Sequence, residues 1–186
     1  MKKPSKPTKK PVSRRPHKLT DQPAGPYKVP AGHVLVLRCC KPDLTSHGGF
    51  RWPALGPVKA DDWLPKPVCG GGLHGWLWGA GDLAAAGDIH AMDDAVWLVL
   101  QVPSADVIDL GGKVKFPRAL VLFSGARGDA VAFVAAHAPV GTVGIYGTAT
   151  AGDSGTATAG DSGTATAGYR GTATAGDSGT ATAGDS

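Results

Sequence analysis

The chain has 186 residues and a formal net charge of +4, which is unevenly distributed. Residues 1–30 carry +8, residues 31–146 carry −1 and residues 147–186 carry −3, so only the first segment is basic. All fifteen acidic residues are Asp, which excludes any mechanism that needs a Glu general base, nucleophile or metal ligand. NAD-consuming transferases characteristically rely on a Glu, so that class of enzyme is disfavoured as well.

Residues 1–30 are rich in Pro and Lys and poor in apolar side chains. Such a segment cannot bury enough surface to offset the loss of backbone entropy, so we predict a disordered basic arm. Its charge suits binding to nucleic acid or an anionic surface. It lacks the repeated aromatic residues that stack on bases, and a solubilising tail without a specific partner is the favoured alternative.

The three cysteines, Cys39, Cys40 and Cys69, are odd in number and two of them are adjacent, which precludes a complete disulfide framework. This favours a reducing compartment, or at least a fold that does not rely on disulfides. No apolar run approaches the length of a membrane-spanning helix, and no signal peptide follows the basic N-terminus. We therefore expect a cytoplasmic location by default and leave non-classical export to the cell surface open.

Residues 31–140 are predicted to form a small α+β domain. Short apolar runs rich in Leu and β-branched residues predict strands that are buried on both faces, at 33–39, 96–102 and 119–123. Residues 113–116 alternate and predict a weaker strand.

The best helix signal covers residues 129–138. Asp129 is the expected N-cap and Pro139 ends the helix, with Val131, Val134 and Ala135 on one face. His137 lies near the negative end of the helix dipole. Residues 81–87 predict a single helical turn.

Residues 147–186 are five tandem octapeptides, with GTATAGYR as the third copy and GTATAGDS as the others. Thr and Ala alternate at the period of a strand, so the threonines face one way and the alanines the other. Gly-Asp-Ser-Gly supplies turn residues. We predict a short all-β solenoid with sixteen residues per coil, preceded by a linker at 141–146. A flexible linker is the alternative reading of the whole array.

In such a coil, Asp153, Tyr169 and Asp185 stack in one column about 4.8 Å apart. Tyr169 interrupts a column of like charges, and Arg170 offers a counter-charge. Two and a half coils give a ladder only about 12 Å long. The array ends at a unit boundary without a capping sequence, so we expect a fragment or short form of a longer protein. Its exposed end is then a surface for self-association.

The stretch AGYRGTATAGDSGTAT, residues 167–182, resembles the repeat of bacterial ice-nucleation proteins in its Ala-Gly-Tyr and Ala-Gly-acidic turns and its T-x-T strand. The resemblance covers the 40 residues of the array. It implies a β-solenoid whose threonine ladders order water, with Tyr169 as the stacking tyrosine. The threonines that would face water or ice are Thr148, Thr150, Thr156, Thr158, Thr164, Thr166, Thr172, Thr174, Thr180 and Thr182.

Residues 31–146 do not resemble the membrane-associated N-terminal domain of ice-nucleation proteins. The pieces GGFRWP, ADDW, CGGGLHGWLWG and DLGGKVKFPR resemble a domain family of bacterial and phage proteins, in which the domain is sometimes followed by such repeats. That second resemblance implies no particular activity.

The most unusual local sequence is CGGGLHGWLWG at 69–79. Its consecutive glycines allow backbone amides to converge on an anion, and two tryptophans on one side of an extended segment would form a stacking platform. The spacing matches neither a P-loop nor a dinucleotide fingerprint. A tight turn before a strand that buries both tryptophans is the favoured alternative. The candidate ligand loop comprises Gly70, Gly71, Gly72, His74, Trp76 and Trp78.

Other polar groups give weaker signals. The cysteines with His47 and His74 lack the paired spacing of structural zinc, so no metal site is predicted. Cys69 with His74 or His137 would pair a nucleophile with a base, but nothing marks the thiol as activated. The basic residues Lys113, Lys115 and Arg118 suit either a phosphate or the protection of an edge strand.

We therefore predict a non-enzymatic structural or surface-interaction protein whose threonine ladders order water or contact ice, with no cofactor. The alternative is a ligand-binding or catalytic module centred on residues 69–78, with the repeats as a passive extension.

Overall fold

The computed structural model describes residues 27–140 and 142–185. The predicted basic arm falls outside the described residues as far as position 26, but its last residues are packed. The Tyr27 hydroxyl donates to Gln101 Oε1 at 2.7 Å, and the Tyr27 carbonyl lies 2.9 Å from His137 Nε2. The globular part therefore begins before residue 31.

An antiparallel sheet of seven strands, in the order β2-β7-β4-β1-β3-β6-β5, organises the globular part. At its centre, β1 (His33–Cys40) and β4 (Val96–Pro103) pair along eight residues. With β7 (Arg118–Gly125), they confirm the strands predicted at 33–39, 96–102 and 119–123. The other strands are β2 (Gly56–Lys59), β3 (Leu73–Leu77), β5 (Ile108–Asp109) and β6 (Val114–Phe116).

Both faces of the central strands are buried, which explains their uninterrupted apolar runs. In β1, Val36 belongs to one core cluster and its neighbours Leu35 and Leu37 belong to another. In β4, Leu98 and Val99 divide in the same way. Successive side chains of a strand point to opposite faces, so each run supplies two cores at once.

The helix α1 (Arg127–Ala135) covers one face of the sheet through Ala130 and Val134. It begins two residues earlier than predicted, with Ala126 at the N-cap and Asp129 in its first turn. Ala135 is exposed, so the predicted apolar face was placed slightly wrongly. The single turn expected at 81–87 is a longer 3₁₀ segment, η3 (Leu83–Ala91), interrupted at Gly87, with shorter 3₁₀ turns at His47–Gly49 and Ser104–Asp106.

The described residues thus form mainly small sheets, with α1 as the one α-helix among them. No helix in this part of the chain is long and apolar enough to cross a membrane.

The octapeptides form five short strands in two parallel sheets, β8-β10-β12 and β9-β11. Each strand pairs with the one sixteen residues away, as in Thr148 with Thr164 and Thr156 with Thr172. Alanines from both sheets form one buried cluster. The strands are β8 (Thr148–Ala151), β9 (Thr156–Ala159), β10 (Thr164–Ala167), β11 (Thr172–Ala175) and β12 (Thr180–Ala183).

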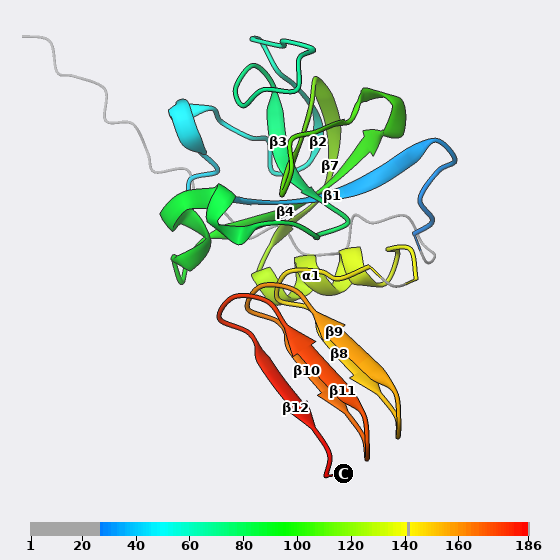
Figure 1. Cartoon of the computed structure of the whole chain (residues 1–186). Helices are drawn as coiled ribbons and strands as arrows, with labels where there is room; N and C mark the ends of the chain where they lie inside the picture. The colour runs from blue at the N-terminus through cyan, green and yellow to red at the C-terminus, as the bar shows by residue number, and fades with distance from the viewer. Residues whose placement is uncertain (1–26, 141, 186) are drawn as a thin grey trace, which may run out of the picture.

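The junction at 142–146 is packed and differs from the predicted linker. Ile145 is only 1% exposed, and its N–H donates to the Gly79 carbonyl at 2.8 Å. The ring of Tyr146 meets Trp97 edge-on at 5.6 Å, and the Arg127 guanidinium lies 4.3 Å from the Tyr146 centroid. Figure 1 shows α1 lying between the antiparallel sheet and strands β8–β12.

Candidate functional site

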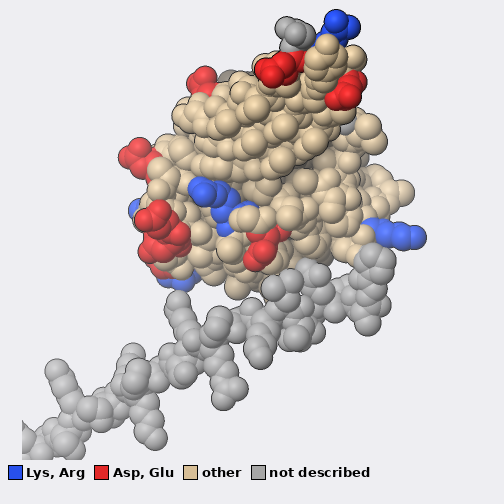
Figure 2. Space-filling view, turned by 90° about the horizontal axis from the view of Figure 1, so that it is seen from below, with Lys and Arg blue, Asp and Glu red and all other residues tan. Residues whose placement is uncertain are grey.

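The threonines of the array are exposed on both parallel sheets, while the alanines between them are buried in β9 and β10, half-buried in β8 and β11, and exposed in β12. This is the alternation that the strand period predicts. The strands carry no charged residue. In Figure 2 the array accordingly presents a broad uncharged surface, with charged side chains gathered at its end. Each sheet therefore offers rows of hydroxyl and methyl groups to solvent.

The turns stack with the same sixteen-residue period. The N–H of Tyr169 donates to Asp153 Oδ1 at 2.9 Å, and the N–H of Asp177 donates to Asp161 Oδ1 at 3.1 Å. Each of these carboxylates thus accepts a hydrogen bond from the next coil. The expected role of Arg170 as a counter-charge is not seen among the salt bridges of the described residues. The Arg170 guanidinium lies 5.2 Å from the centroid of the half-exposed Tyr169 ring instead.

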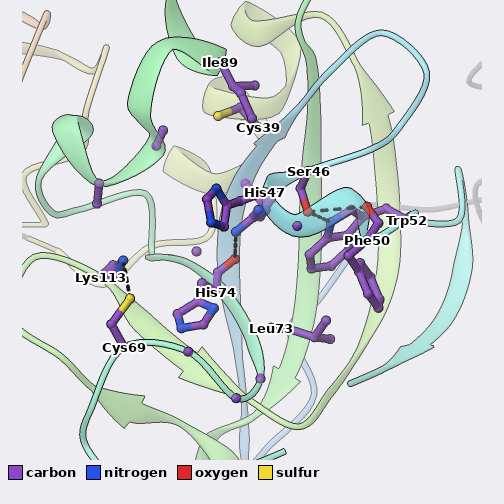
Figure 3. A pocket seen from close by; sticks show the side chains of 18 of the residues that line it. Cys39, Ser46, His47, Phe50, Trp52, Cys69, Leu73, His74, Ile89 and Lys113 are labelled. Carbon is purple, nitrogen blue, oxygen red and sulfur yellow. Dashed lines mark hydrogen bonds between the residues drawn. The ribbon is translucent and has the colours of Figure 1, made fainter. Parts of the chain in front are cut away.

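A cavity of about 800 Å³ lies on the globular part, between β1, β3, η3 and the loops at 46–50 and 69–72. Figure 3 shows Lys113 and Cys69 on one side of it, Phe50 and Trp52 on the other, and His47 and His74 between them. The structure therefore brings part of the predicted ligand loop to a concave surface, the usual form of a small-molecule site.

The three glycines of this loop have positive φ angles, 91° at Gly70, 59° at Gly71 and 144° at Gly72. A Cβ on Gly71 would lie 2.7 Å from Leu64 Cβ, so glycine is required by both backbone and space. The loop is anchored from below by Lys115, whose Nζ donates to the carbonyls of Val68 and Gly70 at 3.0 Å each.

The three basic residues at 113–118 do not form a cluster. Lys115 is fully buried in β6, which lies between β3 and β5 and is not an edge strand. Arg118 pairs with Asp106 at 2.9 Å. Lys113 lines the cavity, with its Nζ 3.3 Å from Cys69 Sγ. The prediction that Lys115 protects an edge strand is therefore wrong. Of these three basic residues, only Lys113 lines the cavity.

His74 lies in β3 and is held without a partner for its Nε2 atom, which is buried. Its carbonyl accepts a hydrogen bond from Arg38 Nη1 at 2.8 Å. Burial, followed by the nearby charges of Lys113, Arg38 and Lys115, lowers the pKa of His74 from 6.5 to about 4.

The lowered pKa of His74 makes stability depend on pH. Below pH 6.5 the unfolded chain binds the proton first, so the free energy of unfolding should fall between pH 6.5 and about 4. Above pH 6.5 both states are neutral at this residue and the contribution is flat. Urea unfolding across this range should show the decrease in the wild type and lose that part of it in His74→Gln. The exposed His47 is the matched control, since His47→Gln retains His74; equal slopes in all three proteins would contradict the assignment.

The two tryptophans do not form a platform for a ligand. Trp76 is 3% exposed, stacks on Trp97 at 5.9 Å, and donates its Nε1–H to the Asp82 carbonyl at 2.8 Å. Trp78 has a φ of 54° and packs, half-buried, against the same core. The alternative, a tight turn before a strand that buries both tryptophans, holds for Trp76 in β3, whereas Trp78 lies beyond the end of that strand and is half-buried.

No group of three or more potential metal ligands occurs among the described residues. Burial raises the pKa of Cys39 to about 12 and of Cys40 to about 11, which keeps both thiols protonated. Cys69 is exposed and lines the same cavity as His74. His137 instead contacts the Tyr27 carbonyl and is not among the residues that line this cavity, so it is not placed to act as a base for Cys69.

Several residues that line the cavity lie earlier in the chain and were not predicted from the sequence. Arg38 is the one charged residue in the apolar run of β1, and its guanidinium lies 5.2 Å from the Trp52 ring centroid. Trp52 in turn donates its Nε1–H to Ser46 Oγ at 3.0 Å. A charge inside a buried strand was the available signal for Arg38.

Comparison with known proteins finds similarity to bacterial ice-nucleation proteins. The chain is 38% identical over 118 residues to an ice nucleation protein of Xanthomonas campestris pv. translucens, covering 62% of this chain and 7% of that protein. Identity is 43% over 106 residues to one of Pseudomonas syringae, covering 56% and 9%, and 41% over 103 residues to one of Pseudomonas fluorescens, covering 54% and 8%.

The chain thus spans less than a tenth of the length of these relatives. The matched lengths exceed the 40 residues of the array, so the similarity reaches further along the chain than the repeats alone suggested. No family model matches the chain. No solved structure matches it either. The five octapeptides are an ice-nucleation-like repeat.

Proposed function

We propose that the array is a closed β-solenoid whose threonine rows order water and contact ice, and that the chain acts by surface interaction without catalysis. The observation that carries the proposal is the register. Threonines sixteen residues apart are direct neighbours in parallel strands, and all ten are exposed.

The physical basis is a regular, stiff surface. Neighbouring strands lie about 4.8 Å apart, and successive outward residues along a strand about 7 Å apart, so the hydroxyls form a two-dimensional grid. Threonine is restricted at χ1 by its branched Cβ, which keeps hydroxyl and methyl groups in place. A grid of fixed groups can hold a water layer in an order that flexible side chains cannot impose. The names of the relatives support water or ice as the partner.

The size of the surface sets the expected strength. Three stacked strands span two inter-strand steps, roughly 10 Å, so a small template is available on the wider sheet. The part of this chain that matches these relatives covers only 7% and 9% of their length, so the relatives are several times longer than this chain. We therefore expect activity to depend on the number of coils.

Lengthening the array tests the proposal. Inserting further copies of the sixteen-residue unit after residue 162 should raise the freezing temperature of droplets step by step, because the ordered area grows with each coil. In the longest array, lysines in place of the outward threonines of only one sheet show which face acts, and the matched control carries the same lysines on the other sheet. Freezing temperatures and thermal hysteresis equal to buffer at every array length would contradict the proposal.

A further inference from the structure

Three cations gather around His74 without a carboxylate partner. Arg38 donates to the His74 carbonyl, Lys113 contacts Cys69 Sγ, and Lys115 donates to two loop carbonyls. Within residues 27–140 and 142–185, the salt bridges join Arg51 to Asp43 and Arg118 to Asp106, and none involves these three cations.

The acidic residues of the cavity do not compensate these charges. Asp61 and Asp62 line it, but both are exposed and neither lies within salt-bridge distance of Arg38, Lys113 or Lys115. Lys115 is fully buried and Arg38 and Lys113 are half-buried. Removing cations from water without a counter-charge costs free energy, and an anion that enters the cavity would recover part of it.

Two buried nitrogen atoms in the same place lack hydrogen-bond partners as well. The Nε2 atom of His74 and the Nε atom of Arg38 are buried and make no hydrogen bond. The consecutive positive φ angles from Gly70 to Gly72 curve the backbone next to them, in the manner of loops that receive anions through their N–H groups. The cavity, at about 800 Å³, is within the size range of small-molecule sites, and Phe50 and Ile89 add apolar surface to its wall.

We propose that this cavity binds a small organic anion, whose phosphate or carboxylate group lies between Lys113, His74 and the loop at 70–72. The site is separate from the threonine rows, and its occupancy does not depend on the proposed function of the array. Lys113 supplies the accessible charge, Lys115 fixes the loop from beneath, and the apolar wall contacts the uncharged part of the ligand.

The test uses the whole chain and two probes, inorganic phosphate and acetate, each titrated at ionic strength held constant with sodium chloride. Amide and imidazole NMR signals report binding. Saturable shifts confined to residues 69–75 and the His74 ring are expected, together with a rise in the pKa of His74, because a bound anion stabilises the imidazolium. Saturation by phosphate alone or by acetate alone identifies the class of anion.

The matched variants are Lys113→Gln and Lys59→Gln. Loss of one charge-assisted hydrogen bond at Lys113 should weaken binding about tenfold, whereas Lys59, exposed on β2 outside the cavity, should leave it unchanged. Dispersed amide spectra verify that both variants are folded. The proposal is overturned if neither probe gives saturable shifts beyond those of chloride, if the pKa of His74 does not move, or if both variants bind as the wild type does.

Discussion

Replacing Ala165 by Asp should unfold the repeat array, and replacing its neighbour Thr166 by Asp should not. Ala165 lies at 0% exposure in β10, the middle strand of its sheet, and belongs to a core cluster made of alanines. An unpaired carboxylate placed there loses its hydration, at a cost of several kcal/mol. The core consists of alanine methyl groups contributed by both sheets, so the larger Asp side chain cannot fit there without separating the two sheets.

Hydrogen–deuterium exchange over residues 147–185 measures this effect directly. Ala165→Asp should bring the exchange of the whole array close to that of an unfolded peptide, while Thr166→Asp should cost no more than about 1 kcal/mol from the low strand propensity of Asp. The pair shares the strand and the introduced residue and differs only in the side of the strand. Equal protection in both variants would mean that the alanines do not form the core.

The sequence alone predicts those parts of the fold in which each residue's own chemistry decides the outcome. Strands β1 and β4 are predominantly apolar because both of their faces are buried, and this can be recognised without knowing which strands they pair with. The same holds for the array, where Thr and Ala alternate in every copy and the copies are identical in their strands.

The cavity could be predicted only in part, because its polar groups depend on residues distant in sequence. The glycines at 70–72 were recognised because they are consecutive, but the burial of Lys115 depends on the carbonyls of Val68 and Gly70, which accept hydrogen bonds from its Nζ at 3.0 Å each. Trp76 and Trp78 share a side in an extended strand; in the structure the strand ends before Trp78, whose φ of 54° begins a turn. Neither the bend nor the carbonyl partners leave a local mark in the sequence.

The junction was predicted wrongly for a related reason. Residues 142–146 read TVGIY; the Thr and Gly favour a loop, and five residues are too few to show the periodicity of a buried element. Ile145 becomes buried because η3, α1 and the first coil meet there. Through this contact the first coil of the array packs against a folded neighbour, the globular part of the chain.

Ile145→Ala should therefore destabilise the globular part and the array together. Removing three carbons from a fully buried site leaves a cavity and typically costs roughly 2–5 kcal/mol. Val140→Ala is the matched control, since Val140 lies five residues away in the chain and is fully exposed; it should change stability by no more than about 0.5 kcal/mol. Denaturant unfolding followed by tryptophan fluorescence reports the globular part, which holds every tryptophan, and hydrogen exchange of residues 148–159 reports the first coil.

The hydrogen bonds of Asp161 show how a loss of packing at Ile145 would affect the strands of the array. Its Oδ2 accepts a hydrogen bond from the N–H of Leu83 at 3.2 Å, its Oδ1 accepts from Asp177 at 3.1 Å, and its carbonyl accepts from Tyr146 at 2.8 Å. One residue thus joins η3, the junction and the second coil. Asp153 makes only the bond to the next coil, so Asp161→Ala should increase exchange in β9 more than Asp153→Ala does. If Ile145→Ala lowers the stability of the globular part and leaves the hydrogen exchange of β8 and β9 unchanged, the globular part does not stabilise the first coil of the array.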